Sequence, residues 1–372
     1  GAAVPVEDVQ ELALALVPVD VLVLVLPHAA GIAYAFLVEA DGGLCAFRSE
    51  VELARRGIGP LIGDDAAFAE GDFRGQAVER GELARGRRRP GTEARFLRMA
   101  DHQRPAAEII LGQRLQRAGL HVPEILHQDL EQGFLLLTDM GNETWLTALN
   151  ESNADAWYSA AIDTLITQQL HTDVAGLPVY DEALLQRELE LFPQWYLFRH
   201  REKVVTGELR QRLDRVFTVL IESALAQPQV FVHRDYMPRN LMVSDPNPGV
   251  LDFQDAVAGP ISYDVISLFK DAFISWPEAR VLGWLREYFD KATAAGLPVP
   301  AEFDTFLRDC DLMGAQRHLK VIGIFARICH RDGKPKYLGD VARFFAYLRT
   351  VIARRPELAD LEWILDQLED NE

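Results

Sequence analysis

The sequence predicts a two-lobed α+β fold, with a small strand-containing N-terminal part and a larger helical C-terminal part. Short apolar runs separated by turn residues lie in the range 21–48. Helical periodicity dominates the chain after residue 141. Within that helical part, the range 229–255 carries two short apolar runs that each end in a group of polar residues. We therefore expect an N-lobe over residues 1–140 and a C-lobe over residues 141–372.

The composition is that of a soluble globular protein. With 372 residues, of which 49% are hydrophobic, the chain can bury one large core or two moderate ones. Its formal charge of −18 opposes nucleic acid or an anionic membrane as the main partner. The apolar segment over 12–26 contains Asp20 and is too short to span a bilayer. The scattered cysteines, Cys45, Cys310 and Cys329, predict free thiols and a cytoplasmic setting.

The predicted N-lobe begins with strands. The runs VLVLVL, IAYAFLVE and LCAFR are separated by PHAAG and ADGG, which is typical of short antiparallel strands joined by turns. The range 55–103 is rich in Gly, Arg, Asp and Ala and predicts mostly loop. Apolar positions at helical spacing over 105–118 predict a helix that ends at Gly119, and residues 134–137 predict a buried strand. The break over 139–141 marks the expected lobe boundary.

The predicted C-lobe is a series of amphipathic helices with no internal repeat. Apolar residues recur at helical spacing in the following ranges: 154–171, 181–200, 208–226, 277–295, 302–329 and 341–353.

The polar residues of the inserted segment have an order that suits phosphoryl transfer. The segment reads QVFVHRDYMPRNLMVSDPNPGVLDFQD. A kinase needs one carboxylate to accept a hydroxyl proton, and further oxygen ligands that hold Mg²⁺ against the phosphates. Asp235 fits the first role, and Asn240 and Asp252 fit the second. The intervening PNPG predicts a turn that brings Asn240 and Asp252 together.

Several neighbours of these residues have simpler explanations. His233 follows an apolar strand and is expected to be structural. Arg234 and Arg239 are most simply partners of nearby carboxylates. Asp264 precedes an apolar helical run, where it would serve as an N-cap or as an ion-pair partner of the catalytic loop. The spacing HRDxxxxN followed by a DF-type aspartate is far more specific than any of its members.

The stretch from about Arg104 onward resembles the aminoglycoside phosphotransferase and choline-kinase-like superfamily. Within it, the chain is most similar to bacterial anomeric kinases of N-acetylmuramate and N-acetylglucosamine. The similarity is carried by AGLHVPEILHQDLEQGFLLLTDMG, YDEALLQRELELFPQWYL, FVHRDYMPRNLM, GVLDFQDAVAGPISYDVISLFKDAFISW and QRHLKVIGIFARICHRDGKPKYL.

This resemblance implies a two-lobed, protein-kinase-like fold that uses ATP and Mg²⁺. It implies that Thr138, Asp139 and Met140 form the hinge whose backbone meets adenine. It also implies transfer of the γ-phosphate to the anomeric hydroxyl of an amino sugar, in the salvage of cell-wall precursors.

The N-terminal part departs from the family pattern. A kinase N-lobe usually supplies a lysine to the phosphates, but the first lysine of this chain is Lys203. Candidates for phosphate contact are the range 63–75, Arg98 and Arg104. The Arg, Gly and Ala bias of about the first hundred residues suits a shifted reading frame in a GC-rich gene. Sequencing the gene would test that hypothesis.

The acceptor is expected to contact C-lobe helices in which aromatic and basic residues alternate. Trp195 and Tyr196 would stack on a sugar face. A lactyl carboxylate would meet cations from the following set: Arg317, His318, Lys320, Arg327, His330 and Arg331. The alternative is helix packing with solvated charges. A polycationic aminoglycoside is less well matched, because the 317–336 segment is basic.

Two rival functions stay open on the sequence. One is an aminoglycoside or choline-type kinase with the same mechanism. The other is a pseudokinase-like binding module, which the irregular N-terminal part would suit. The sequence leaves the oligomeric state and the choice between ATP and GTP open.

Overall fold

The computed structural model describes residues 21–28, 31–40, 43–47, 94–98, 105–129 and 134–369. The chain forms two compact units. One unit comprises Gly1–Ile109 and Pro123–Asp139, and the other comprises Ile110–Val122 and Met140–Glu372. The candidate phosphate-contacting range 63–75, the side chains of Arg98 and Arg104, and most of the segment behind the reading-frame hypothesis lie outside the described residues.

The first unit contains the predicted N-terminal strands. β1 (Val21–His28), β2 (Gly31–Ala40) and β3 (Gly43–Phe47) form an antiparallel sheet in the order β1-β2-β3. Val21 pairs with Val38, and Phe36 pairs with Phe47. The three apolar runs of the sequence therefore form a meander, as their turn residues predict.

A second sheet of the first unit has the order β4-β6-β5, with β4 at Ala94–Arg98, β5 at Ile125–Asp129 and β6 at Phe134–Thr138. The strand predicted over 134–137 is confirmed. The range 55–103 was predicted to be mostly loop, and the strand β4 within it was not predicted. The five residues ARFLR are too short to show periodicity, and their strand partner is β6, far along the chain.

The second unit is helical, and its elements have the bounds α2 (Pro105–Arg117), α3 (Trp145–Ala148), α4 (Ala154–His171), α5 (Glu182–Leu189), η2 (Phe192–His200), α6 (Gly207–Ala226), α7 (Ser262–Phe269), α8 (Glu278–Ala295), α9 (Phe303–Asp332), α10 (Val341–Ile352) and α11 (Ala359–Glu369). The N-terminal residues of α2 belong to the first unit. Most predicted helices agree with these bounds to within a few residues.

One predicted helix is two elements. The range 181–200 was expected to be a single helix, but α5 ends at Leu189 and a π-helix, η2, follows. Pro193 lacks an N–H and therefore cannot continue the ordinary hydrogen-bond ladder. The wider turn is visible where the Arg201 amide donates to the Tyr196 carbonyl at 2.9 Å.

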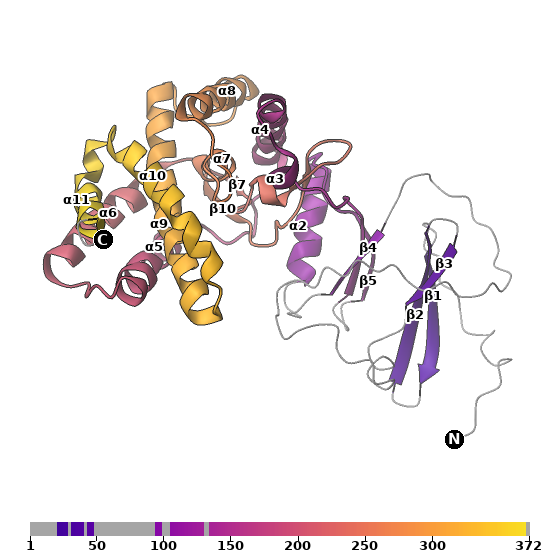
Figure 1. Cartoon of the computed structure of the whole chain (residues 1–372). Helices are drawn as coiled ribbons and strands as arrows, with labels where there is room; N and C mark the ends of the chain where they lie inside the picture. Colours follow the sequence, from indigo (N-terminus) through magenta and orange to yellow (C-terminus); the bar gives the residue numbers. More distant parts are fainter. Residues whose placement is uncertain are drawn as a thin grey trace, which may run out of the picture. The chain divides into compact units, whose positions relative to one another are not determined.

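Helix α9 is the centre of the helical unit. It packs against α6, α7, α10 and η2, as the ribbon in Figure 1 shows. Gly323 permits a close approach to the residue before η2, because a Cβ at this position would lie 2.4 Å from the backbone carbon of Leu191. Most residues of α9 between Cys310 and Ala326 are buried, including several that carry charge.

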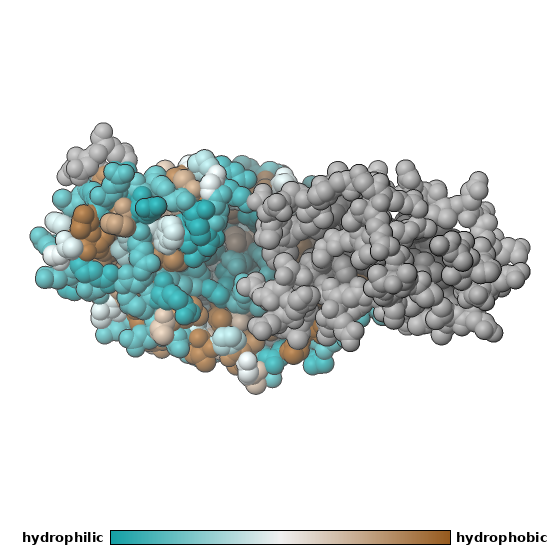
Figure 2. Space-filling model, turned by 90° about the horizontal axis from the view of Figure 1, so that it is seen from below, coloured by the Kyte–Doolittle hydropathy of each residue, from teal (hydrophilic) through white to brown (hydrophobic). Residues whose placement is uncertain are grey.

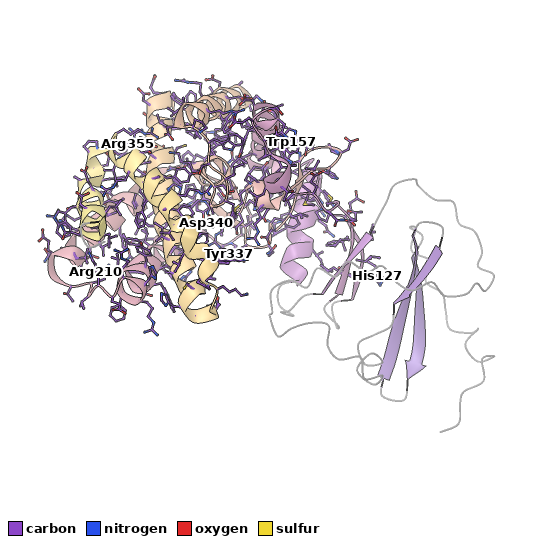
Figure 3. The ribbon with its side chains drawn as sticks, in the orientation of Figure 1. His127, Trp157, Arg210, Tyr337, Asp340 and Arg355 are labelled. Atoms are coloured by element: carbon purple, nitrogen blue, oxygen red, sulfur yellow. The ribbon has the colours of Figure 1, made fainter. Side chains whose placement is uncertain are left out.

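The surface of the described part is mostly hydrophilic on the face seen in Figure 2, with apolar residues in small separate patches. Ion pairs link the helices. Arg210, labelled in Figure 3, joins α6 to Glu190 at 2.7 Å, and Arg355 joins the C-terminal end to Asp311 at 2.7 Å. Among the described residues, no helix is long and apolar enough to cross a membrane.

Candidate active site

The HRD segment follows a buried two-stranded ribbon. β7 (Gln229–Val232) pairs antiparallel with β10 (Val257–Pro260), and the chain leaves β7 directly into His233. A short 3₁₀ turn, η3 (Pro238–Asn240), then leads into the hairpin formed by β8 (Leu241–Met242) and β9 (Gly249–Val250). The hairpin predicted around PNPG is confirmed.

The hairpin brings Asn240 and Asp252 together across twelve residues of sequence. The Asn240 side-chain amide donates to Asp252 Oδ2 at 3.3 Å and to the Asp235 carbonyl at 2.9 Å. Gln254 donates to the other oxygen of Asp252 at 2.7 Å. Because both amide hydrogens of Asn240 are directed at these oxygens, its own carbonyl oxygen is left for another partner.

Asp235 is half-buried, and no other described residue donates a hydrogen bond to its carboxylate. Its backbone is fixed on both sides: the amide donates to His233 Nδ1 at 3.3 Å, and the carbonyl accepts from Asn240. A carboxylate held by its backbone with its oxygens open is suited to accept a proton from a bound hydroxyl.

Asp264, in the first turn of α7, fixes the backbone of the HRD segment. Its Oδ2 accepts the His233 amide at 2.7 Å and its Oδ1 accepts the Arg234 amide at 3.0 Å. Gln168 of α4 donates to the same carboxylate at 3.2 Å. Asp264 is completely buried, and burial raises its pKa above the usual range. It is therefore neither an N-cap nor a side-chain ion-pair partner, but an acceptor for two consecutive backbone amides.

His233 is also completely buried. Its ring lies edge-on to Tyr236 and Phe253, and its Nε2 has no partner among the described residues. This position accords with the structural role expected from the sequence.

Backbone strain concentrates in this loop. Arg234 has φ +75° and Asp252 has φ +68°, both in the left-handed region that non-glycine residues seldom adopt. Such conformations persist only where surrounding contacts hold them, and they cluster at functional sites. The two Asp264 hydrogen bonds hold the first of them, directly before Asp235.

The pair Asn240 and Asp252 offers the hard oxygen ligands that Mg²⁺ prefers. Within the described part of the chain, no three His, Cys, Asp or Glu side chains gather into a metal cage. This donor set fits a magnesium ion that takes its remaining ligands from phosphate and water, as is usual for nucleotide-bound Mg²⁺.

The segment expected to form the hinge joins β6 to the helical unit. The Thr138 amide donates to the Glu124 carbonyl at 2.9 Å, and its hydroxyl accepts from the Glu124 amide at 2.8 Å. Both of these Thr138 groups bond to Glu124, the residue before β5. Met140 is buried against the catalytic hairpin, where a Cβ on Gly249 would lie 2.4 Å from the Met140 methyl carbon.

Comparison with known proteins identifies the family. Residues 75–303 match the phosphotransferase enzyme family. An N-acetylmuramate/N-acetylglucosamine kinase from Pseudomonas aeruginosa is 63% identical over 255 residues, which cover 68% of this chain and 75% of that protein. The chain belongs to this phosphotransferase family.

Other similarities agree with this placement. An N-acetylmuramate/N-acetylglucosamine kinase from Neisseria meningitidis is 46% identical over 257 residues. The matched residues cover 68% of this chain and 77% of the Neisseria protein. The crystal structure of choline kinase LicA from Streptococcus pneumoniae superposes with a TM-score of 0.50 at 12% identity, covering 70% of this chain and 87% of that one. The predicted protein-kinase-like α+β fold is thus confirmed.

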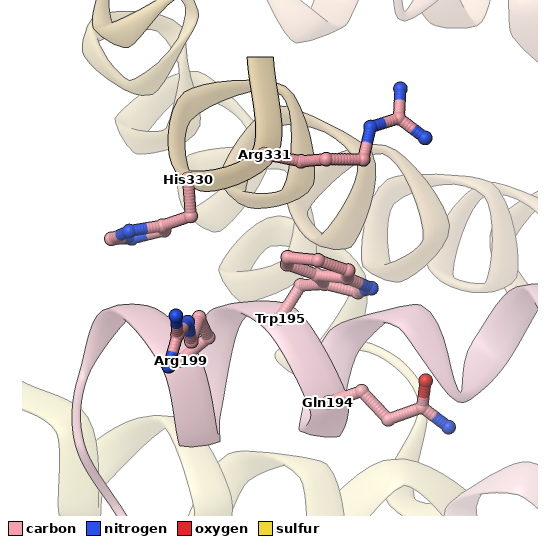
Figure 4. Close-up of a pocket in the computed structure, with 5 residues that line it drawn as sticks. All are labelled: Gln194, Trp195, Arg199, His330 and Arg331. Atoms are coloured by element: carbon pink, nitrogen blue, oxygen red, sulfur yellow. The ribbon is translucent and has the colours of Figure 1, made fainter. Parts of the chain in front are cut away.

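The expected acceptor residues of the phosphotransferase do not lie in one place. Trp195, with Gln194, Arg199, His330 and Arg331, lines a cavity of about 440 Å³ between η2 and the end of α9. In Figure 4 the Trp195 indole lies beneath the last turn of α9, from which His330 and Arg331 project.

Arg317 lies much earlier on α9. It is buried, donates to Ser267 at 2.6 Å and interacts electrostatically with Asp235. At 1.5 Å per residue, Arg317 and His330 are about 20 Å apart along the helix. Arg327 falls between them, half-buried, and burial together with the Arg331 charge lowers its pKa.

The structure places His318, a predicted acceptor contact, in the helical core. His318 is completely buried, and its ring stacks on Tyr347 at 5.1 Å in the helical core. Neither ring nitrogen has a partner among the described residues, and burial holds the pKa of His318 well below the usual range. Helical position decides this outcome: Arg317 and His318 are neighbours in sequence but point about 100° apart around α9.

Sequence reasoning missed a second buried carboxyl near the site. Asp271 follows α7, is 1% exposed, and accepts the Ala272 amide at 2.6 Å, while its Oδ2 has no partner among the described residues. Burial raises the pKa of Asp271 to about 6. The Asp271 carboxyl therefore holds its proton more tightly in the folded protein than in the unfolded protein. As the pH rises from the unfolded pKa of about 4 through the folded pKa of about 6, ionisation of Asp271 lowers the free energy of unfolding.

The substitution Asp271→Asn removes this ionisation. We expect the stability of the variant relative to the natural protein to increase by about 1–2 kcal/mol between pH 5 and pH 7, and to level off above pH 7. Urea unfolding of both proteins across pH 5–8 measures this difference. A difference that stays constant over the range would contradict the assignment of a raised pKa to Asp271.

Proposed function

We propose that this phosphotransferase transfers the γ-phosphate of ATP to the anomeric hydroxyl of an amino sugar, N-acetylmuramate or N-acetylglucosamine, in the cytoplasm. The observation that carries the proposal is the 63% identity to a protein named N-acetylmuramate/N-acetylglucosamine kinase. It is supported by the open carboxylate of Asp235 beside the Asn240 and Asp252 pair.

In this proposal Asp235 orients the anomeric hydroxyl and accepts its proton. The sugar oxygen forms a bond to the γ-phosphorus, the bond between that phosphorus and the bridging oxygen breaks, and ADP leaves. Asn240 and Asp252 would hold Mg²⁺, which neutralises phosphate charge when bound. Thr138, Asp139 and Met140 are proposed as the segment that meets adenine.

We assign nucleotide binding to residues 1–140 and the catalytic loop and acceptor site to residues 141–372. Among the cations expected to contact the acceptor, Arg317 interacts electrostatically with Asp235. This interaction supports a role for Arg317 near the reacting hydroxyl. Trp195 and Arg327 are proposed to contact parts of the acceptor that lie farther from the reacting hydroxyl. Arg327 lies ten residues after Arg317 on α9, and Trp195 lies on η2 beside the end of α9.

An acceptor panel tests the proposal. ADP release is measured with N-acetylmuramate, N-acetylglucosamine, kanamycin and choline, each with Mg-ATP. We expect release with one or both amino sugars and none above background with the others. If ADP release were greater with kanamycin or choline, that compound would be the acceptor in place of the amino sugar. Absence of any thermal shift with Mg-ATP would instead indicate a binding module that does not use nucleotide.

A further inference from the structure

A buried carboxylate outside the catalytic loop, that of Glu188, pairs with two cations that interact electrostatically with Asp235. Glu188 lies on α5 and is 5% exposed. Its Oε1 accepts from Arg234 Nη2 and lies 2.9 Å from Lys320 Nζ. Its Oε2 accepts from the Tyr180 hydroxyl and lies 3.4 Å from Gln316 Nε2. Every oxygen of this carboxylate is therefore directed to a partner inside the helical unit.

Both of these cations interact electrostatically with the Asp235 carboxylate. Arg234 directly precedes Asp235 in the strained loop, and Lys320 interacts electrostatically with Asp235 across the interior. Lys320 is 8% exposed and also donates to the Tyr263 hydroxyl at 3.0 Å. A buried cation needs a nearby carboxylate. If Glu188 were absent, the next carboxylate that interacts with both cations would be Asp235.

Pairing of that kind would oppose the reaction. A carboxylate whose oxygens accept from an ammonium or guanidinium group is less able to take a proton from a substrate hydroxyl. In the structure, Lys320 and Arg234 each pair with Glu188, and the Asp235 carboxylate accepts from no described residue. The distribution of partners therefore separates the base from its cationic neighbours.

We propose that Glu188 is a positioning residue that keeps Arg234 and Lys320 off the catalytic carboxylate of Asp235. The inference rests on the proposed function and adds a residue on α5 to it. The sequence holds a signal for this position: Leu185, Leu189 and Phe192 define the buried face of the segment, and Glu188 falls on that same face. An acidic residue on a core face needs buried partners.

A double-mutant cycle tests the proposal. Glu188→Gln keeps the side-chain volume but removes the charge, and we expect kcat to fall by about a hundredfold while the KM for ATP changes little. Lys320→Met alone should cost less than about tenfold, because Arg234 still has Glu188. The double variant should recover at least about tenfold in kcat over Glu188→Gln, because the freed ammonium group is gone.

A purely structural role for Glu188 predicts no recovery of kcat in the double variant. The double variant would then be as inactive as Glu188→Gln or worse, and that result would overturn the proposal. Glu190→Gln is the matched control, since Glu190 is two residues away and pairs with Arg210 on the outer side; its kcat should stay within about twofold.

Two further measurements keep the result interpretable. Unfolding midpoints of all variants separate lost folding from lost turnover. If Glu188→Gln does not fold, the same cycle is run with Glu188→Asp, where recovery of kcat by Lys320→Met supports the proposal and its absence overturns it. The natural protein is assayed beside them with N-acetylmuramate and with N-acetylglucosamine. Inactivity with both sugars counts against the proposed function, whereas activity without coupling counts only against the role of Glu188.

Discussion

Replacing Asp235 with alanine is expected to lower kcat by about 10²–10⁴-fold, which is the usual contribution of a positioned general base. The physical reason is the open carboxylate at the end of the HRD segment, held by its backbone and paired with no described side chain. Because Asp235 is half-buried and makes no buried side-chain bond, the fold should change little. Steady-state turnover of the amino sugar, together with the unfolding midpoint, measures both effects.

The control for this variant is Asp290→Asn. Asp290 is an exposed carboxylate of α8, outside the catalytic loop, and its replacement alters the net charge by the same amount. Turnover of the control should stay within about twofold of the natural protein. If Asp235→Ala kept more than a tenth of the natural turnover, the assignment of Asp235 as the base would be abandoned.

Replacing Asp264 with alanine is expected to affect both stability and turnover. The His233 and Arg234 amides would lose their shared acceptor in a completely buried position. Each buried donor without an acceptor costs about 1–3 kcal/mol, so the free energy of unfolding should fall by about 2–5 kcal/mol. Relief of the buried carboxyl offsets part of that cost, because burial raises the pKa of Asp264.

The folded fraction of Asp264→Ala should turn over at least about a hundredfold more slowly, because the strained Arg234 backbone that positions Asp235 is no longer held. Asp264→Asn retains one carbonyl acceptor and should lie between the two proteins in both measurements. Urea unfolding gives the stability, and kcat under conditions where the variant is folded gives the turnover. A variant as active as the natural protein would show that these two hydrogen bonds do not position the base.

The catalytic loop was predictable because its chemistry depends on local spacing. Asn240 and Asp252 are joined by a short hairpin whose turn residues stand in the sequence. The helices were predictable because their apolar faces repeat over many residues, as α4 shows with the predicted bounds. The meander of β1, β2 and β3 was predictable from its turn residues for the same reason.

The contacts that support the loop were not predictable, because they join distant segments. Glu188 lies 46 residues before Arg234, and no local pattern states that α5 and the HRD segment meet. The positions of the predicted acceptor residues were not predictable for a related reason. A run of aromatic and basic residues along α9 distributes its side chains around the helix, so His318 enters the core while Arg317 faces the catalytic region. The π-helical pitch of η2 had no signal beyond Pro193.

In the proposed function, the phosphate goes to the anomeric hydroxyl of an amino sugar. The most direct test is phosphorus and carbon NMR of the product formed from N-acetylmuramate and Mg-ATP by the natural protein. The proposed function predicts one new phosphate ester whose phosphorus couples to the anomeric carbon. A phosphate on another hydroxyl, or ADP release without any sugar phosphate, would contradict it.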